Sequence, residues 1–530
     1  IRELTYKKGL IRSTGLKDED NVSTYSMYNR FCEPVAKIAP HRILAINRGE
    51  KEEFLQIKIE APEEEIIKLI QIKHIKQHSP TQGLLEKAIE DAYKRLIAPS
   101  IEREIRNILT EKAEEQALNI FSKNLKHLLM QAPVKNKVIM GFDPAYRTGC
   151  KVAIVDRSGK LLTHLVCFPT PPQNKTDETK RQLIPLIEKY EVDVISLGNG
   201  TASRESEMFL CELINEVNRP VSYVVVSEAG ASVYSASELA TKEFPELDVS
   251  YRGAVSIARR LQDPLAELVK IDPKALGVGQ YQHDVNQKKL SEKLAGVVED
   301  CVNSVGVDVN TASPSLLNYV SGINTTTAEN IVKFREENGI FKSRKELLKV
   351  PRLGPKTFEQ CAGFLRIPES ENILDNTAVH PESYKPAEKI MQIYSLDELK
   401  EKSFNKKEIE QLSQTLDIGI PTLKDILDEL KKPGRDPREE LPSPIFRTDV
   451  LEISDLKPGM ILMGTVRNIT DFGAFIDIGV HQDGLAHISE LSESFVRSPF
   501  DILNVGDTVK VKVLSVDAER NRISLSLKCC

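Results

Sequence analysis

The chain has 530 residues and a formal net charge of -6. A chain of this length exceeds what one hydrophobic core can organise, so we expect about three to five domains. The small negative charge excludes a uniformly basic coat for nucleic acid, and no apolar run approaches the roughly 18 residues that a membrane span needs. We therefore expect a cytoplasmic protein with no membrane partner, in which any nucleic-acid contact comes from local patches.

Residues 1–133 are predicted to form a helical scaffold. Two amphipathic helices are expected at residues 83–96 and 100–129, divided at Pro99 because proline ends a helix. The chain opens on Ile1 within a predicted helix and not on Met, so we expect that the full protein extends further at its N-terminus. The eight cysteines show neither zinc-ligand spacing nor a disulfide framework.

Residues 134–262 change to the period of buried strands. The predicted order is three strands (137–142, 151–155, 160–166), a helix (176–190), a strand (192–197), a helix (204–217) and a strand (221–226). This order indicates an α/β domain with a mixed sheet. It resembles the ribonuclease H-like fold that Holliday-junction resolvases share.

Carboxylates decide whether such a domain can be a nuclease, because cleavage needs three or four of them around two divalent ions about 3.5–4 Å apart. The candidates for catalysis and metal binding are Asp143 after the first strand, Glu228 after the last strand, and Asp263. At the fourth strand, where the resolvases place an acid, Asn199 stands instead. Asp143 and Asp263 both precede proline and can simply be caps, and Glu228 can cap or pair with an arginine. We expect no cofactor, and Mg²⁺ or Mn²⁺ only if the domain is a nuclease.

The turn from Gly198 to Arg204 opens a predicted helix and could hold an anion such as phosphate, since helix N-termini attract negative charge. We favour a simpler interpretation, a capped and tightly packed turn between strand and helix.

Residues 263–371 are predicted to be helical and to repeat one arrangement twice, a helix, a tight glycine turn and a second helix. Gly322 and Gly354 lie in the two turns, where backbone N–H groups can approach a phosphate. The arrangement resembles a tandem helix-hairpin-helix, which binds backbone without reading sequence; a plain helical hairpin is the alternative. Cations between or beside the turns are Lys342, Arg344, Lys345, Lys349, Arg352 and Lys356, and we select Lys349, Arg352 and Lys356 as nucleic-acid contacts.

Residues 372–454 are predicted to be a second small helical module followed by a linker that is rich in proline and charge. Residues 455–528 alternate apolar and polar side chains at period two between Gly, Asp and Asn turns, which predicts a small closed β-barrel.

The barrel carries Asp471-Phe-Gly-Ala-Phe475 and Gly484-Leu-Ala-His-Ile-Ser489, which resemble an S1 RNA-binding domain. Barrels of this oligonucleotide-binding type stack bases on aromatic rings and meet phosphates with Lys and Arg. Phe475 is alternatively a core residue. The nucleic-acid-binding candidates are Phe472, Phe475 and His487 as a stacking surface and Lys510, Lys512, Arg520 and Arg522 as phosphate partners.

The order of these domains, with stretches such as Gly198-Asn-Gly-Thr-Ala-Ser-Arg-Glu205 and Ser256-Ile-Ala-Arg-Arg-Leu-Gln-Asp-Pro-Leu265, resembles the Tex family of bacterial transcription accessory proteins. The resemblance implies a multi-domain α/β plus α plus β architecture that ends in an S1 barrel. It implies nucleic-acid binding, chiefly through the S1 domain, and an association with transcription. Our first hypothesis is a non-catalytic factor that binds single-stranded RNA or DNA through the S1 domain and nucleic-acid backbone, including duplex, through the hairpins. The alternatives are a metal-dependent, structure-specific nuclease, and a docking platform for RNA polymerase or the ribosome.

Overall fold

A computed structural model of the chain describes residues 1–16, 24–76, 80–441, 444–448, 456–470, 472–480, 482–494, 496, 499–503, 507–517 and 522–528. The chain forms two compact units. One consists of Ile1–Lys123 together with Val278–Lys293, and the other of Asn124–Gly277 together with Leu294–Cys530. The first unit is therefore assembled from two segments that are far apart in the sequence.

The first unit contains a sheet that the sequence prediction of a helical scaffold missed. Its strands are β1 (Leu10–Gly15), β2 (Arg30–Pro34) and β3 (Leu55–Glu60), in the antiparallel order β2-β1-β3. In β3 the apolar Leu55, Ile57 and Ile59 are buried and the residues between them are exposed, which is the period of a half-buried strand. The helices are α1 (Arg2–Lys8), α2 (Pro40–Lys51), α3 (Glu63–His74) and α4 (Gln82–Ala92).

The helix break predicted at Pro99 does not occur. A π-helical segment, Tyr93–Ile97, follows α4 and leads directly into α5 (Ala98–Leu129), a helix of 32 residues. Pro99 is only the second residue of α5. The π segment changes the backbone hydrogen-bond pattern just before Pro99. Proline has no N–H to donate, and near the start of an α-helical segment an N–H can be left without a partner.

The α/β domain confirms the predicted order of strands and helices. The sheet order is β6-β5-β4-β7-β8, in which β4, β7 and β8 run parallel and β5 and β6 are antiparallel to their neighbours. The elements are β4 (Ile139–Asp143), β5 (Cys150–Val155), β6 (Leu161–Cys167), α6 (Thr176–Lys189), β7 (Val194–Gly198), α7 (Ser203–Glu216), β8 (Ser222–Val226), α8 (Ala231–Ser235), α9 (Glu238–Glu243) and α10 (Val249–Gln262).

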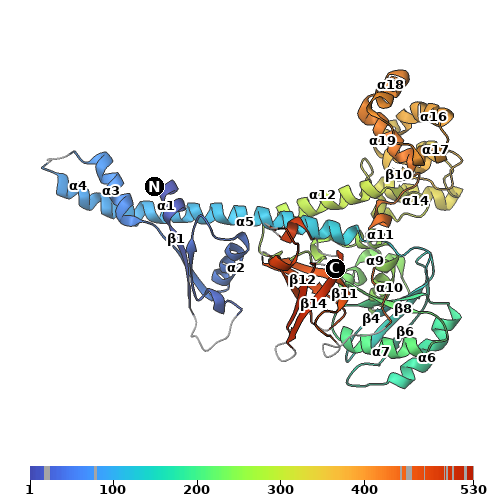
Figure 1. The fold of residues 1–530 in the computed structure, drawn as a ribbon, viewed down its shortest axis with the longest axis horizontal. Helices are drawn as coiled ribbons and strands as arrows, with labels where there is room; N and C mark the ends of the chain where they lie inside the picture. The colour runs from blue at the N-terminus through green and yellow to red at the C-terminus, as the bar shows by residue number, and fades with distance from the viewer. Residues whose placement is uncertain are drawn as a thin grey trace. The chain divides into compact units, whose positions relative to one another are not determined.

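Helices cover both faces of this sheet. Leu183 of α6 and Phe209 of α7 pack with Phe142 on one face, and Ala258 of α10 packs with Ile139 on the other. Helix α10 approaches β4 so closely that a Cβ on Gly141 would lie 2.0 Å from the Ala254 carbonyl oxygen. Asp143 ends β4, Asn199 follows β7 and Glu228 follows β8, so the candidate polar residues lie at the carboxyl ends of the three parallel strands. Figure 1 labels β4 and β8 of this sheet.

The helical region that follows holds two small modules. The first contains α11 (Pro264–Leu268), the part of α12 (Gln287–Val305) that follows Lys293, α13 (Pro314–Leu317), α14 (Thr325–Asn338) and α15 (Pro355–Cys361), with a two-stranded parallel sheet of β9 (Val307–Asp308) and β10 (Leu365–Arg366). The second contains α16 (Tyr384–Ile393), α17 (Leu396–Glu401), α18 (Lys406–Leu416) and α19 (Ile420–Lys431) around a core of its own. Capping boxes at Ser395 and Asn405 start α17 and α18.

The C-terminal strands close into the predicted barrel, in the order β11-β12-β13-β15-β14. They are β11 (Ile461–Thr470), β12 (Gly473–Asp477), β13 (Gly484–His487), β14 (Thr508–Asp517) and β15 (Arg522–Ser526). Strands β13 and β15 close the barrel as a parallel pair, and the other pairs are antiparallel.

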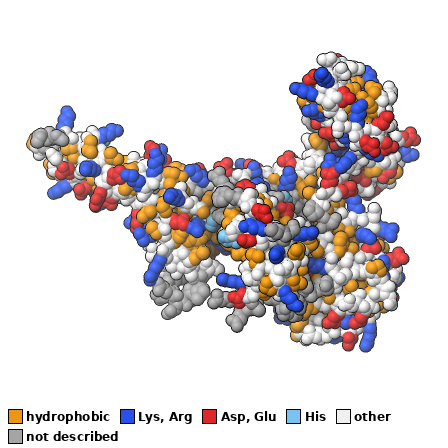
Figure 2. Space-filling model, in the orientation of Figure 1, with side chains coloured by type: hydrophobic (Ala, Val, Ile, Leu, Met, Phe, Trp, Pro, Cys, Tyr) orange, Lys and Arg blue, Asp and Glu red, His pale blue; other side chains and the backbone are white. Residues whose placement is uncertain are grey.

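Charged side chains of both signs are interspersed over the face that Figure 2 shows, in keeping with the small net charge. Within the part of the chain that the structure describes, no helix is both long enough and apolar enough to cross a membrane.

Candidate nucleic-acid interface

The aromatic residues of the barrel lie together at one end of β12 and β13. Gly473 is opposite His487 in this pair, and the Ile488 N–H donates to the Phe472 carbonyl over 2.8 Å. Only glycine fits at position 473, because a Cβ there would lie 2.3 Å from the Ala486 carbonyl oxygen. The sequence Phe-Gly therefore lets β12 approach β13 closely and places Phe472 beside His487.

Phe472, Phe475 and His487 form the aromatic platform. Phe472 is 49% exposed, and its ring meets the Phe475 ring edge-on with centroids 6.1 Å apart. Phe475 is half-buried and lies outside the buried core cluster of the barrel. His487 is exposed, with Nδ1 2.9 Å from the Ser489 hydroxyl. Three rings with exposed edges or faces provide a surface on which bases can stack.

The cations predicted for this barrel lie away from the platform. Lys510 and Lys512 of β14 face Met463 and Ile461 at the start of β11, whereas Phe475 faces Asn468. Asn468 follows Met463 by five residue steps, which correspond to about 17 Å of strand. Arg522 begins β15, beside Asp517 and at the opposite end of β13 from His487. Arg520 lies outside the described residues.

Arg467 is the cation beside the platform, and the sequence prediction missed it. It occupies a β-bulge between Val466 and Asn468, and Asn468 is the residue paired with Phe475. Its Nη2 lies 2.6 Å from Asp477 Oδ2, on the strand that carries Phe475. The sequence showed Arg467 in a predicted strand, but only the strand register could place it next to the platform.

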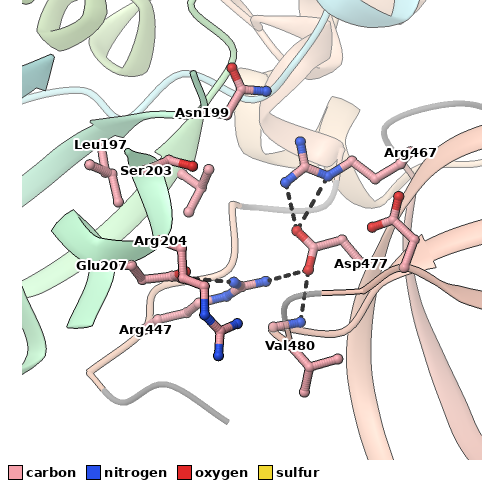
Figure 3. Close-up of a pocket in the computed structure, with 12 residues that line it drawn as sticks. Leu197, Asn199, Ser203, Arg204, Glu207, Arg447, Arg467, Asp477 and Val480 are labelled. Atoms are coloured by element: carbon pink, nitrogen blue, oxygen red, sulfur yellow. Dashed lines mark hydrogen bonds and ion pairs between the residues drawn. The ribbon is translucent and has the colours of Figure 1, made fainter. Parts of the chain in front are cut away.

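A second arginine, Arg447, joins the barrel to the α/β domain (Figure 3). Its backbone pairs with Tyr223 of β8, through two N–H to O=C bonds of 2.9 Å each. Its guanidinium lies 3.4 Å from Glu207 of α7 and 3.5 Å from Asp477 of β12. Burial alone would raise the pKa of Asp477, but Arg467 and Arg447 lower it. We call the Glu207–Arg447–Asp477 connection the arginine clamp.

The two hairpin turns expose most of the cations predicted beside them. Gly322 has a φ of +81° and Arg352 a φ of +68°, so one turn uses glycine and the other uses arginine for the left-handed position. Gly354 has extended backbone and caps α15, with nothing within 4 Å of a Cβ built on it. Lys349, Arg352 and Lys356 are exposed, although Lys349 also pairs with Glu346 at 3.2 Å.

Arg344, which lies among the same cations in the sequence, is instead 1% exposed. Its guanidinium donates to the carbonyl groups of Leu365 and Val379, each at 2.7 Å, and to that of Thr377. It also donates to the Tyr384 hydroxyl over 2.8 Å. Arg344 therefore connects the two helical modules and does not face solvent.

Two of the three candidate carboxylates approach each other. Asp143 ends β4 and Glu228 follows β8; burial and then the charge of Glu228 raise the pKa of Asp143 to about 6. Burial also raises the pKa of Glu228. Asn199, at the position of the missing acid, accepts the Glu228 N–H over 3.1 Å. Burial lowers the pKa of Arg260 of α10, and the charges of Glu267, Glu228 and Asp143 oppose this shift. Its Nη1 donates to the carbonyl groups of Ser227 and Ala229, on either side of Glu228.

The third candidate, Asp263, is held elsewhere. Its carboxylate caps α11 by accepting the Ala266 N–H over 3.1 Å, and it binds the Arg438 guanidinium at 2.6 and 3.2 Å. The structure thus shows the capping role that the proline after Asp263 suggested. In the described part of the chain, no group of three or more His, Cys, Asp or Glu side chains is arranged to hold a metal ion.

Comparison with known proteins decides the family. Residues 1–121 match the Tex central region-like family, 137–262 the Tex protein YqgF-like domain, 302–366 a helix-hairpin-helix motif, 372–438 an HHH domain and 455–528 the S1 RNA binding domain. Protein tex of Bordetella pertussis is 46% identical over all of this chain and 69% of its own length. The chain belongs to the Tex family.

Two further relatives support this assignment. The uncharacterized protein YdcI of Bacillus subtilis is 53% identical over 99% of this chain and 74% of its own length. The transcriptional accessory protein Tex of Neisseria gonorrhoeae is 50% identical over 95% of this chain and 67% of its own length. This Tex family chain thus combines a YqgF-like domain, helix-hairpin-helix modules and an S1 RNA binding domain.

The raised pKa of Asp143 gives this Tex family chain a specific pH dependence. The folded state holds the Asp143 proton up to about pH 6, above the ordinary pKa of an aspartate near 4. The stability that this carboxyl contributes is therefore complete below about pH 4 and is lost as the pH rises through about 6. We expect Asp143→Asn to remove this loss and to raise the free energy of unfolding at pH 8 by about 2 kcal/mol relative to the native sequence.

Urea unfolding at about pH 4.5 and pH 8 in metal-free buffer measures this difference. Asp177→Asn, a change of an exposed carboxylate on α6, is the matched control and should leave the pH dependence as it is. If Asp143→Asn keeps the full pH dependence of the native sequence, the Asp143 carboxyl is not the group responsible.

Proposed function

We propose that this Tex family chain is a transcription accessory factor that binds single-stranded RNA or DNA through its S1 barrel and carries out no chemical step of its own. The aromatic platform is the observation that carries the proposal. Phe472 is half exposed although it is a large apolar residue, and it stands beside the exposed His487. Exposed rings on the outer face of an oligonucleotide-binding barrel suit base stacking, which tolerates many sequences.

The helix-hairpin-helix turns are proposed to hold nucleic-acid backbone. Arg352 and Lys356 are exposed and have no ion pair among the described residues, so their charges are available to phosphates. The open space beside Gly354 allows a phosphate to approach the backbone. Such contacts add affinity without sequence preference.

Two arginines, Arg438 and Arg260, support the proposal that the chain carries out no chemical step. Arg438 occupies the carboxylate of Asp263, and the charge of Arg260 of α10 acts on Asp143 and Glu228. The ion pair at Asp263 and the buried positive charge that acts on Asp143 and Glu228 both oppose the binding of divalent ions, which need these carboxylates as ligands. The role in transcription rests on the relatives named as Tex, and binding to RNA polymerase or the ribosome would be one way to exert it.

Replacing Phe472 by alanine tests the platform. We expect the affinity for single-stranded RNA to fall by about 1–3 kcal/mol, the contribution of one stacked base. Fluorescence anisotropy with a labelled oligouridylate measures the affinity across a series of salt concentrations. The same mixtures, incubated with Mg²⁺ or Mn²⁺ and run on a denaturing gel, are expected to contain intact RNA.

Leu514→Ala is the matched control, because Leu514 is also an exposed apolar residue of the barrel but lies on β14. It should bind as the native sequence does. Equal affinities for Phe472→Ala and the native chain would remove the platform from the binding site. Metal-dependent cleavage that disappears in Asp143→Asn would replace the proposal with the nuclease alternative.

A further inference from the structure

A cavity of about 160 Å³ lies where the barrel meets the α/β domain. The barrel contributes Arg467 and Asp477 to its wall, and the α/β domain contributes Asn199, Ser203 and Arg204 from the turn that opens α7 (Figure 3). The arginine clamp forms another part of the wall through Arg447 and Glu207. Polar side chains of both domains therefore line the cavity, together with the apolar Leu197, Val225 and Val480.

The wall holds three guanidinium groups, of Arg204, Arg447 and Arg467, and three carboxylates, of Glu207, Asp477 and Asp483. Burial raises the pKa of Asp483, and the charge of Asp477 raises it further. Glu207, Arg447, Asp477 and Arg467 form a continuous chain of ion pairs, in which two carboxylates balance two guanidinium groups. Arg204 is half-buried in the wall and makes no ion pair or hydrogen bond with any described residue. An arginine held this way, at the positive end of α7, provides donors for an anion.

The cavity continues the face of the barrel that carries the platform. Phe475 and Asp477 are two residues apart on β12, so their side chains point to the same side of the strand about 7 Å apart. Arg467 lies beside both, through the bulge in β11 and its ion pair with Asp477. A single-stranded nucleic acid whose bases stack on the platform can therefore continue along β12 to the cavity.

We propose that the single-stranded nucleic acid bound by the platform extends into this cavity, where Arg204 of the YqgF-like domain contacts a backbone phosphate. The inference rests on the proposed function and adds a second domain to its binding site. The arginine clamp is then a positioning device, because it holds the barrel at the place where Arg204 can reach a strand that leaves the platform. The S1 barrel alone would lack this phosphate contact.

The test compares oligouridylates of about 4 and about 16 nucleotides, the two ends of the range of site sizes for barrels of this kind. In the complete chain, Arg204→Ala should weaken binding of the long RNA about fivefold to tenfold and leave the short RNA unaffected. The slope of the logarithm of the long-RNA binding constant against the logarithm of the salt concentration should also become shallower by about 0.7, which is the contribution of one phosphate contact on a single strand.

Arg181→Ala is the matched control, since Arg181 is an exposed arginine on α6 of the same domain and has no ion pair among the described residues. It should change neither affinity nor slope. If Arg204→Ala binds the long RNA as tightly and with the same salt slope as the native chain, the inference is wrong. Equal losses for Arg204→Ala and Arg181→Ala would also overturn it, because they would indicate a general effect of charge.

A double-mutant cycle tests the role of the clamp. Arg447→Ala should weaken long-RNA binding about as much as Arg204→Ala does, and Arg204→Ala should cause no further loss in that background. A thermal melt confirms that the barrel remains folded in Arg447→Ala. Additive losses in the cycle would show that Arg204 acts without the docked barrel and would overturn the inference.

Phe472→Ala separates this inference from the proposed function. If Phe472→Ala weakens binding of both RNAs and Arg204→Ala weakens binding of neither, the platform binds RNA but the RNA does not extend into the cavity. If Phe472→Ala changes nothing, the proposed function itself fails, whatever Arg204→Ala does.

Discussion

Replacement of Arg344 by methionine is expected to destabilise the helix-hairpin-helix region by about 3–5 kcal/mol. Methionine fills much of the same volume but removes donors to the carbonyl groups of Leu365, Thr377 and Val379, which would remain buried and unpaired. The carboxylate of Asp375, which accepts the Arg344 backbone N–H and the Tyr384 hydroxyl, would also lose the nearby positive charge.

Hydrogen exchange of the amides in β10 and α16 measures the effect, because Arg344 donates to Leu365 in β10, to Tyr384 at the start of α16 and to carbonyl groups between these elements. Lys345→Met is the matched control, since the neighbouring Lys345 is exposed and its replacement should change exchange by less than about 0.5 kcal/mol. Equal protection in the two variants would mean that the buried guanidinium adds nothing to the junction of the modules.

Replacement of Arg438 by alanine is the second change with a large expected effect, again about 3–5 kcal/mol. Arg438 is 3% exposed and lies between two carboxylates, with Nη1 2.6 Å from Asp263 and Nη2 2.9 Å from Asp436. Its removal leaves both carboxylates partly buried without their main partner. The expected readout is a lower midpoint of urea unfolding and faster proteolysis near the C-terminal end of the second helical module.

The loss of folding stability at acidic pH gives an independent check of the role of Arg438. Burial would raise the pKa of Asp436, but its bonds with Arg438 and Lys135 outweigh burial and lower it to about 2. The stability contributed by Asp436 is therefore present above about pH 4 and is lost as the pH falls toward 2. Arg438→Ala should reduce this acid loss, whereas Arg435→Ala, which removes an exposed partner of Glu440, should not. An unchanged loss of stability at acidic pH in Arg438→Ala would contradict the assignment.

Much of the fold was predictable because it depends on local patterns. The buried strands of the YqgF-like domain and the alternating strands of the barrel have periods that identify them, and glycines or prolines mark their ends. The sheet of the first unit was missed because two of its strands have only a weak apolar pattern: β2 has no buried residue, and β1 buries only Ile11 and Ser13. The helix break at Pro99 was predicted wrongly because a π-helical segment, which leaves no mark in composition, accommodates the proline.

The site was predictable only in part, because its remaining features depend on contacts between distant residues. Phe472, Phe475 and His487 were found from a short motif, and the structure brings them together. The position of Arg467 beside the platform depends on strand register. The ion pair of Asp263 depends on an arginine 175 residues further along the chain. Neither relationship can be read from spacing in one sequence.

The two-segment construction of the first unit has a consequence for synthesis. Val278–Lys293 completes a unit whose other residues all precede position 124, and Tyr281 and Asp284 of this segment interact with Arg48. At about 5–20 residues per second, a ribosome takes roughly 8–30 s to translate the intervening residues. The nascent first unit must therefore wait, incomplete, while the entire YqgF-like domain emerges and folds, which makes that interval the time at which chaperones or mispairing would act on this chain.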